Sequence, residues 1–130
     1  MFAIEVQSTF SAAHALRLPD GRHEALHGHD FHVTVRIGAD QLDALETVAD
    51  FHDIHDALTV IVAPWRNRNL NDIEPFKTRV NPSAERIAEH IGIQLATALA
   101  TADREHSRHL RLLEVRVTEA PQCVAIWRPE

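Results

Sequence analysis

Apolar and polar residues alternate in two segments near the N-terminus. The first is residues 2–9, FAIEVQST. The second is residues 31–37, where every second residue is apolar: Phe31, Val33, Val35 and Ile37. Successive side chains of a β-strand point to opposite faces of the sheet. Both segments therefore predict strands that turn one face toward a core.

The middle of the chain changes to the spacing of an α-helix. Asp50 is a candidate N-cap, apolar residues then recur every three or four positions, and Pro64 ends the run. A second helix is predicted to open at Asn81-Pro82, a cap residue followed by proline at the first helical position. It continues to about residue 102 with apolar residues at four-residue intervals: Ile87, Ile91, Leu95 and Leu99.

Strand alternation returns in residues 110–118, and a last short strand is predicted over residues 123–127. The order strand, strand, helix, helix, strand, strand favours an α+β fold, in which a four-stranded antiparallel sheet carries both helices on one face. Such a sheet has two edges, which are often covered by assembly, so we expect an oligomer. No repeat, linker or change in composition divides the sequence, and we expect a single domain over residues 1–130.

Composition narrows the classes of function. The chain has 130 residues and a formal net charge of −6. This charge disfavours a protein that binds nucleic acid or membrane surfaces, since both need a basic face. No apolar run approaches the roughly 18 residues of a membrane-spanning helix, and the first ten residues lack the pattern of a signal peptide. Because the single cysteine, Cys123, can form no disulfide within the chain, we expect a cytoplasmic protein.

Histidine is the unusual residue, with ten in the chain. His27 and His29 flank a glycine in LHGHD, where the second strand begins, and residues two apart in a strand point to the same side. His14 follows the first strand in FSAAHAL, and pairing of the two strands would bring it to the same place. Three histidines with one open position are typical of a catalytic zinc site, although a His-x-His pair also arises by chance. Apart from His23, we expect the others to be surface or capping residues: His32, His52, His55, His90, His106 and His109.

Several short motifs occur in the same order as in a known family. They are FSAAH at 10–14, LHGHDFHVTV at 26–35, DF at 50–51, LND at 70–72, NPSAE at 81–85 and VTEA at 117–120. Together they resemble the 6-pyruvoyltetrahydropterin synthase and 6-carboxytetrahydropterin synthase family over about residues 2–128. The resemblance implies the tunnelling fold (T-fold), in which a four-stranded antiparallel sheet carries two helices, three subunits close a barrel, and two trimers form a homohexamer.

The resemblance also implies a metal, a substrate and site residues. His14, His27 and His29 match the three histidines that hold zinc (Zn2+) in the family. The zinc binds oxygens of the side chain of 7,8-dihydroneopterin triphosphate, where a Lewis acid makes a neighbouring C–H more acidic. Glu119 in VTEA matches the glutamate that anchors the pterin ring, since a carboxylate can accept two parallel N–H bonds, and is a candidate for both ring binding and catalysis. Without the resemblance, Glu119 would be interpreted as a solvated acid at a strand end.

The sequence departs from the family pattern at the groups that transfer protons. His23 stands where the carboxy-type members usually have a cysteine, and Cys123, far away on the last strand, is expected in the core. Arg66 and Asn67 stand where the family usually has an aspartate–histidine pair. Thiolate chemistry is impossible for histidine, but an imidazole moves protons near neutral pH. His23, with Glu24 beside it, is therefore the candidate proton-transfer group.

Three hypotheses follow for the function. The first is a lyase of the 6-carboxy- or 6-pyruvoyl-tetrahydropterin synthase type, acting on 7,8-dihydroneopterin triphosphate or a related dihydropterin with an altered proton relay. The second is a metal-bearing protein that binds a pterin or purine without turnover. The third is a hexamer whose zinc only ties strands together, which three ligands argue against because structural zinc sites usually have four. A synthase of this kind is compatible with queuosine, biopterin or folate synthesis.

Overall fold

The structure, a computed structural model, describes residues 1–106 and 110–130 of the chain. Its elements follow the predicted order, with one short strand added between the helices. They are β1 (Phe2–His14), β2 (His27–Ala39), α1 (Phe51–Val62), β3 (Arg68–Asn69), α2 (Ala84–His106), β4 (Arg111–Ala120) and β5 (Cys123–Trp127). Two short 3-10 helical turns, Ala63–Trp65 and Leu70–Asp72, flank β3.

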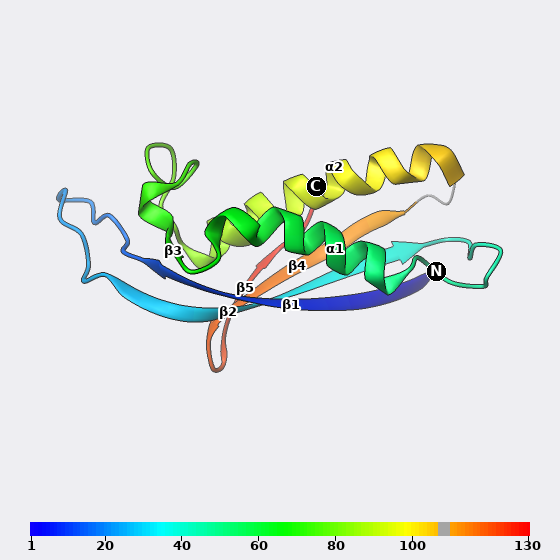
Figure 1. Cartoon of the computed structure of the whole chain (residues 1–130), viewed down its shortest axis with the longest axis horizontal. Coiled ribbons are helices and arrows are strands. Elements are labelled where there is room, and N and C mark those ends of the chain that lie inside the picture. The colour runs from blue at the N-terminus through cyan, green and yellow to red at the C-terminus, as the bar shows by residue number, and fades with distance from the viewer. Residues whose placement is uncertain (107–109) are drawn as a thin grey trace.

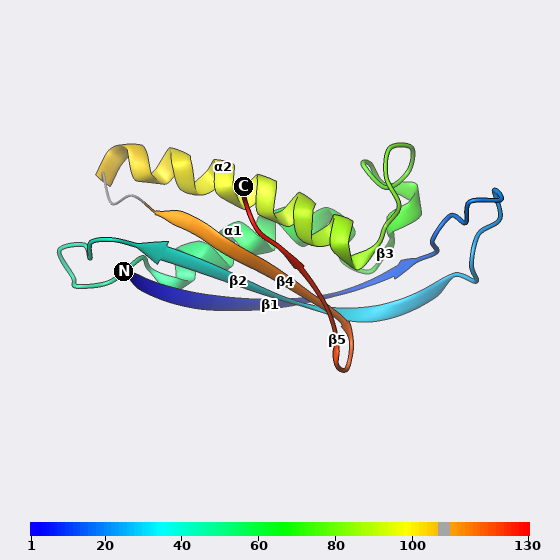
Figure 2. The ribbon, with the colours of Figure 1, turned by 180° about the vertical axis from the view of Figure 1, so that it is seen from behind.

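The strands form one sheet in the order β3-β1-β2-β4-β5, and both helices cover the same face of it (Figure 1; Figure 2). The predicted α+β class with two helices is confirmed. The predicted four-stranded antiparallel sheet is wrong, because β3 adds a fifth strand that runs parallel to β1 and makes the sheet mixed. Only Arg68 and Asn69 of β3 take part in this pairing, with Ala12 and Ala13 of β1. A two-residue strand has no alternation to detect, so the sequence pattern missed it.

β1 and β2 are longer than predicted and pair over their whole length. Their antiparallel register puts His14 opposite His27 at one end of the pair. Burial continues to alternate beyond residue 9, since Phe10, Ala12 and His14 are buried. His14 is therefore the last residue of β1, and the expectation that it follows the strand is corrected. The small residues at 11–13 hide this part of the strand in the sequence because they interrupt the apolar pattern.

The core lies between the sheet and the two helices. The four apolar residues predicted to face inward in residues 31–37 are 0% exposed, and so are Ile87, Ile91 and Leu95 of α2. Burial of such side chains is the main favourable term in folding. Gly92 lets α2 approach β5 closely, because a Cβ atom at this position would overlap the ring of Trp127. The helix is thus held against the far edge of the sheet as well as its centre.

The predicted cap is confirmed for α1 and wrong for α2. The Asp50 carboxylate accepts a backbone N–H of the first turn of α1 at 2.8 Å. In α2 the hydroxyl of Ser83, rather than Asn81, accepts a backbone N–H of the first turn, at 3.2 Å. Asn81 instead accepts the backbone N–H of Arg17 at 2.7 Å and donates to its carbonyl at 3.0 Å. The loop before α2 is therefore tied to the segment that follows β1.

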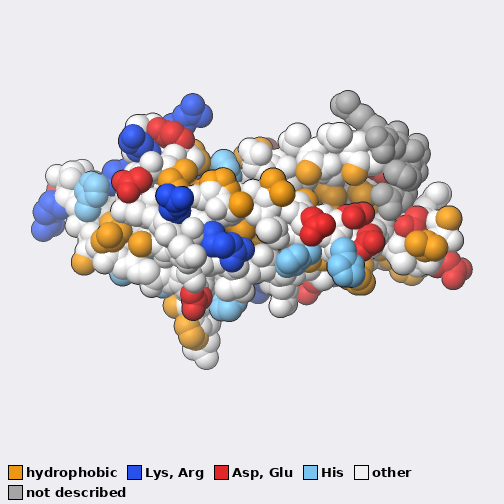
Figure 3. Space-filling model, viewed as in Figure 1, with side chains coloured by type: hydrophobic (Ala, Val, Ile, Leu, Met, Phe, Trp, Pro, Cys, Tyr) orange, Lys and Arg blue, Asp and Glu red, His pale blue; other side chains and the backbone are white. Residues whose placement is uncertain are grey.

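Most of the histidines expected at the surface are there. The exposed ones are His32, His52 and His55. Acidic and histidine side chains gather over α1 (Figure 3). His90 is an exception, since it is partly buried and its ring centroid lies 5.2 Å from that of Trp65. The side chain of His106 and the whole of His109 lie outside the described residues.

Cys123 lies on β5, at the edge of the sheet, and is exposed. Its predicted place in the core is therefore wrong, because the sequence does not reveal that the last strand is an edge strand. Among the helices of residues 1–106 and 110–130, none has the length and apolarity needed to cross a membrane.

Candidate metal centre

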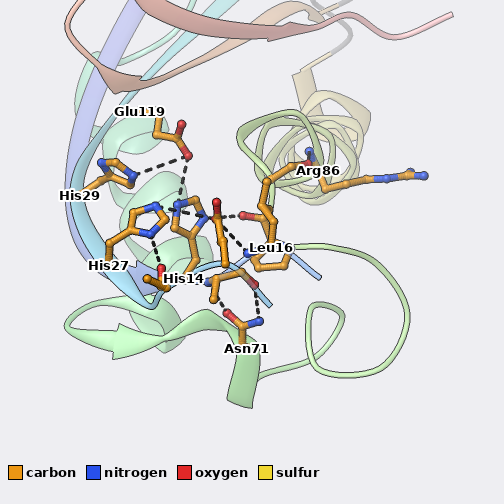
Figure 4. Close-up of polar contacts among 12 residues, drawn as sticks. His14, Leu16, His27, His29, Asn71, Arg86 and Glu119 are labelled. Atoms are coloured by element: carbon orange, nitrogen blue, oxygen red, sulfur yellow. Dashed lines mark hydrogen bonds and ion pairs between the residues drawn. The ribbon is translucent and has the colours of Figure 1, made fainter. Parts of the chain in front are cut away.

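Three histidines meet at one end of the β1–β2 pair. His14 and His27 are opposite each other in the register, and His29 lies two residues further along β2, opposite Ala12. Because positions two apart share a face, all three imidazoles lie on one side of the sheet. Their ring centroids are 4.7, 5.1 and 4.9 Å apart. One ligand nitrogen of each ring lies within 4.8 Å of the others, and Figure 4 shows the rings gathered beside Glu119.

Backbone carbonyls orient two of these rings. The Nδ1 atoms of His14 and His27 lie 2.7 Å from the carbonyl oxygens of Pro82 and Ala25, respectively. A carbonyl oxygen only accepts hydrogen bonds, so Nδ1 donates in both rings, which leaves Nε2 as the atom that can bind a metal. Histidines that bind metals typically donate their other ring N–H to such an oxygen.

The Nε2 atoms of His14 and His29 are buried and have no hydrogen-bond partner among the described residues. Buried polar atoms nearly always have a partner, so two orphaned nitrogens at one place need an explanation. A divalent cation bound by the three lone pairs provides one, and histidine nitrogen is a common ligand of zinc. The donor set therefore fits a metal ion.

The protonation state of His29 also suits a metal ligand. Burial of the ring is the main reason that the pKa of His29 is lowered. The carboxylate of Glu119 opposes this change in pKa, and the neighbouring His14 and His27 add to it. The ring is therefore neutral near pH 7, and a neutral imidazole is the form that binds a metal.

Two carboxylates flank the three imidazoles. Oε1 of Glu119, on β4, is 3.1 Å from Nε2 of His14 and 3.8 Å from Nε2 of His29 (Figure 4). Oε1 of Glu24, in the loop between β1 and β2, is 3.9 Å from Nε2 of His27. The two glutamate side chains are 32% and 35% exposed, so both can reach a molecule that enters from solvent.

Two hollows open beside His29. The first has a volume of about 440 Å³, with Thr118 and Glu119 on its wall. The second has a volume of about 400 Å³, with Asn67 and Arg68 on its wall. Ligand pockets in proteins commonly measure about 300–1,000 Å³. The space on either side of His29 is therefore large enough for a small organic molecule.

Of the candidate proton-transfer residues, Glu24 is near the histidines and His23 is exposed. His23 pairs through its backbone with Arg17, across the loop between β1 and β2. The same oxygen of Glu24 that approaches His27 accepts the backbone N–H of Leu16 at 2.9 Å, which fixes the carboxylate in place.

Arg66 and Asn67 bond to the backbone of β1. The guanidinium of Arg66 donates to the carbonyl of Thr9 at 3.2 Å, and the N–H of Asn67 donates to the carbonyl of Ser11 at 2.7 Å. Asn67 has a φ of 58°, in the left-handed region that asparagine tolerates better than most residues. Both residues therefore hold the segment just before β3 against β1.

Asn71 holds the end of β1, and the sequence analysis gave it no role although it lies in the LND motif. Its side chain accepts the backbone N–H of Ala15 at 2.9 Å and donates to the carbonyl of Ala15 at 2.7 Å. Ala15 directly follows His14, so this pair of bonds fixes the backbone beside the first histidine. The partners are 56 residues apart, and no local pattern in the sequence signals such a contact.

A family model described as 6-pyruvoyl tetrahydropterin synthase matches residues 3–130. The chain belongs to this family. The resemblance of the sequence motifs is thereby confirmed. No curated protein matches the chain closely enough to count as a relative.

Solved structures of the family share the fold of this chain. The 6-pyruvoyl tetrahydropterin synthase of Caenorhabditis elegans matches with a TM-score of 0.78 at 22% identity, covering 99% of this chain and 96% of that one. A Plasmodium vivax synthase in which a catalytic glutamate is replaced by alanine matches with a TM-score of 0.79 at 20% identity, covering 98% and 97%. The Plasmodium falciparum synthase matches with a TM-score of 0.76 at 20% identity and the same coverage.

Proposed function

We propose that this family member is a zinc-dependent lyase that acts on 7,8-dihydroneopterin triphosphate, of the 6-carboxy- or 6-pyruvoyl-tetrahydropterin synthase type. The observation that carries the proposal is the convergence of three imidazoles, two of which have buried Nε2 atoms without a hydrogen-bond partner among the described residues. Membership of the family supports pterin chemistry at this centre.

His14, His27 and His29 would hold the zinc ion. A bound zinc ion would act as a Lewis acid on the oxygens of the substrate side chain and make the adjacent C–H more acidic. The chain contributes the orientation of the rings, through the hydrogen bonds of His14 and His27 to backbone carbonyls. It also limits water around His14, which is 1% exposed.

Glu24 is the group that we assign to proton transfer from the substrate side chain, with His23 beside it exchanging the proton with solvent. The carboxylate is 3.9 Å from Nε2 of His27, within the reach of a substrate bound at the metal. A side chain in this role has to approach the reacting C–H, and of the two candidates Glu24 is the one with a contact to an imidazole of the centre. The catalytic glutamate of the Plasmodium vivax synthase supports a carboxylate in this role.

Glu119 is the group that we assign to the pterin ring. It lies on the wall of the hollow of about 440 Å³ beside His29. A carboxylate accepts two parallel N–H bonds from a ring that carries adjacent donors, which gives orientation as well as affinity.

The experiment is to incubate the zinc-loaded protein with 7,8-dihydroneopterin triphosphate and to separate the products by chromatography. The proposal expects loss of triphosphate or cleavage of the side chain, abolished by His29→Ala. His55→Ala is the control, because His55 is an exposed histidine of α1 that lies on the wall of neither hollow. Absence of any conversion over hours by the zinc-loaded protein would contradict the proposal.

The alternative is a metal-bearing protein that binds a pterin or purine without turnover. The observation in its favour is that Arg66 and Asn67, at the positions of the family's aspartate–histidine pair, bond to the backbone of β1. This alternative expects tight binding of 7,8-dihydroneopterin without conversion, lost on Glu119→Gln. Sustained turnover would exclude it.

We further propose that residues 1–130 form one pterin-synthase-like domain, that six copies assemble as a dimer of trimers, and that the protein is cytoplasmic. The edge strand β5 supports assembly, because it has an unpaired side and exposes Val124 and Ile126 by 39% and 45%. Native mass spectrometry is the test, with a hexamer expected and a monomer contradicting the assembly.

A further inference from the structure

One carboxylate oxygen of Glu119 lies against two of the histidines. This atom, Oε1, is 3.1 Å from Nε2 of His14 and 3.8 Å from Nε2 of His29, and neither nitrogen has a hydrogen-bond partner among the described residues. Nδ1 of His14 donates to the carbonyl of Pro82, which leaves Nε2 facing the carboxylate oxygen. A cation bound by the oxygen and both nitrogens satisfies all three atoms at once.

We propose that Glu119 is the fourth protein ligand of the metal centre when no substrate is bound. The proposal rests on the proposed function in so far as His14, His27 and His29 hold a divalent cation. Zinc is commonly four-coordinate and accepts a carboxylate oxygen together with histidine nitrogens. The resting centre then has three nitrogen ligands and one oxygen ligand, all from this chain.

The charge of the site favours the same assignment. Three neutral imidazoles leave the two positive charges of a divalent cation uncompensated, at a place where His14 is 1% exposed and His29 is 22% exposed. A charge withdrawn from water needs a partner of opposite sign. The carboxylate of Glu119 is the closer of the two acids to the imidazoles and reduces the net charge of the centre to one.

Glu24 is the other carboxylate that could act as the fourth metal ligand, but its contacts differ from those of Glu119. Its Oε1 atom lies beside one imidazole only, 3.9 Å from Nε2 of His27. The same atom already accepts the backbone N–H of Leu16 at 2.9 Å. Glu119 approaches two imidazoles and makes no hydrogen bond to a backbone group among the described residues, so its carboxylate is available for a metal without breaking another contact.

The assignment gives Glu119 two successive partners. A carboxylate that bonds to the pterin ring is no longer available to the cation, so binding of a dihydropterin releases Glu119 from the centre. The position that Glu119 leaves is the one that a substrate oxygen takes. The resting site is thereby closed to water and other small ligands until a pterin with the matching N–H donors arrives.

The test uses Co²⁺, whose visible absorption depends on the number and kind of its ligands. Wild-type protein, Glu119→Gln and the matched control Glu24→Gln are each titrated with Co²⁺ alone, with affinity measured against a chelator. We expect Glu119→Gln to shift the absorption bands and to weaken Co²⁺ binding by at least about tenfold, the lower end of what changes around a metal ligand usually cost. Glu24→Gln should keep the wild-type bands and affinity.

The outcomes separate this proposal from the proposed function. If wild-type protein binds no Co²⁺, the metal centre and the function that depends on it are both wrong. If Co²⁺ binds with the same bands and affinity in wild-type protein and Glu119→Gln, only the ligand assignment is overturned. If Glu119→Gln fails to fold, a crystal structure of the zinc-loaded, substrate-free wild type decides, with a Glu119 oxygen expected at about 2.0–2.2 Å from zinc.

Discussion

The three histidines and the loop that joins them are held in different ways. His14, His27 and His29 lie on two 13-residue strands whose register is fixed by backbone pairing over their whole length. The loop between the strands is exposed over residues 18–23, and a few hydrogen bonds orient it. The metal ligands are thus positioned by the sheet, whereas the candidate proton-transfer residues are positioned by the loop. Metal binding should therefore depend on few residues, and catalysis on more.

The largest expected effect comes from the strand end itself. His14→Ala removes one of the three histidine ligands, so we expect zinc affinity to fall by more than about 100-fold, beyond the usual effect of changes outside the ligand set. Activity with 7,8-dihydroneopterin triphosphate should fall to background. Metal content after dialysis and a competition titration check the affinity. His55→Ala, on the exposed side of α1 and outside both hollows, should keep both properties, and an equal loss there would contradict the assignment of the metal to the strand end.

The loop is tested by comparing Glu24→Gln with His23→Ala. Glu24→Gln should keep zinc and reduce kcat by about 10²–10⁴-fold, the usual contribution of a general acid or base. His23→Ala should reduce kcat less, because the exposed imidazole acts through Glu24. Steady-state kinetics on zinc-loaded protein measure both. A larger loss in His23→Ala than in Glu24→Gln would reverse the assignment, and loss of zinc in Glu24→Gln would remove the contrast between loop and strands.

Asn71 and Asn81 test how far the end of β1 depends on contacts with distant loops. Each holds the backbone N–H and carbonyl of one residue after β1: Asn71 holds Ala15, and Asn81 holds Arg17. Either change to alanine should lower the free energy of unfolding by about 1–3 kcal/mol, because two backbone groups lose their partners. Chemical denaturation measures this change.

Both asparagines border His14, since Asn71 bonds to the next residue, Ala15, and Asn81 precedes Pro82, whose carbonyl accepts the Nδ1–H of His14. Either change should therefore also weaken zinc binding, which a competition titration against a chelator measures. Wild-type zinc affinity in both variants would show that the end of β1 needs no support from these asparagines.

The smallest expected effect lies in the body of the fold, at His90. Burial lowers the pKa of His90 below its ordinary value of 6.5, and Glu89 opposes this to a smaller extent. The unfolded chain therefore binds a proton more readily, so stability falls as the pH drops below about 6.5. His90→Gln should reduce this dependence on pH. Thermal unfolding of the metal-free proteins between pH 5 and 7 measures this dependence, and His29 contributes equally to the wild type and the variant. The same change of stability with pH in both proteins would contradict the prediction.

The sequence predicts well those parts of the fold that have a long periodic pattern. The alternation in residues 31–37 and the four-residue spacing from Ile87 to Leu99 both correspond to buried faces. The meeting of His14 with His27 and His29 follows from the pairing of two such strands, so the sequence alone indicates that these metal-ligand candidates lie together.

The parts that were missed depend on contacts between distant residues. β3 has only two residues, and its place in the sheet follows from its pairing with β1. Asn81 resembles a helix cap in the sequence but bonds to Arg17, and Ser83 caps α2 in its place. The position of Glu24 depends on the path of an exposed loop, which has no periodic pattern to reveal it.

The most direct test of the account is a crystal structure of the protein grown with zinc, with anomalous data collected at the zinc absorption edge. The account predicts one zinc ion per chain, bound by Nε2 of His14, His27 and His29 at about 2.0–2.1 Å. A zinc ion at another place, or none within bonding distance of these three nitrogens, would contradict it.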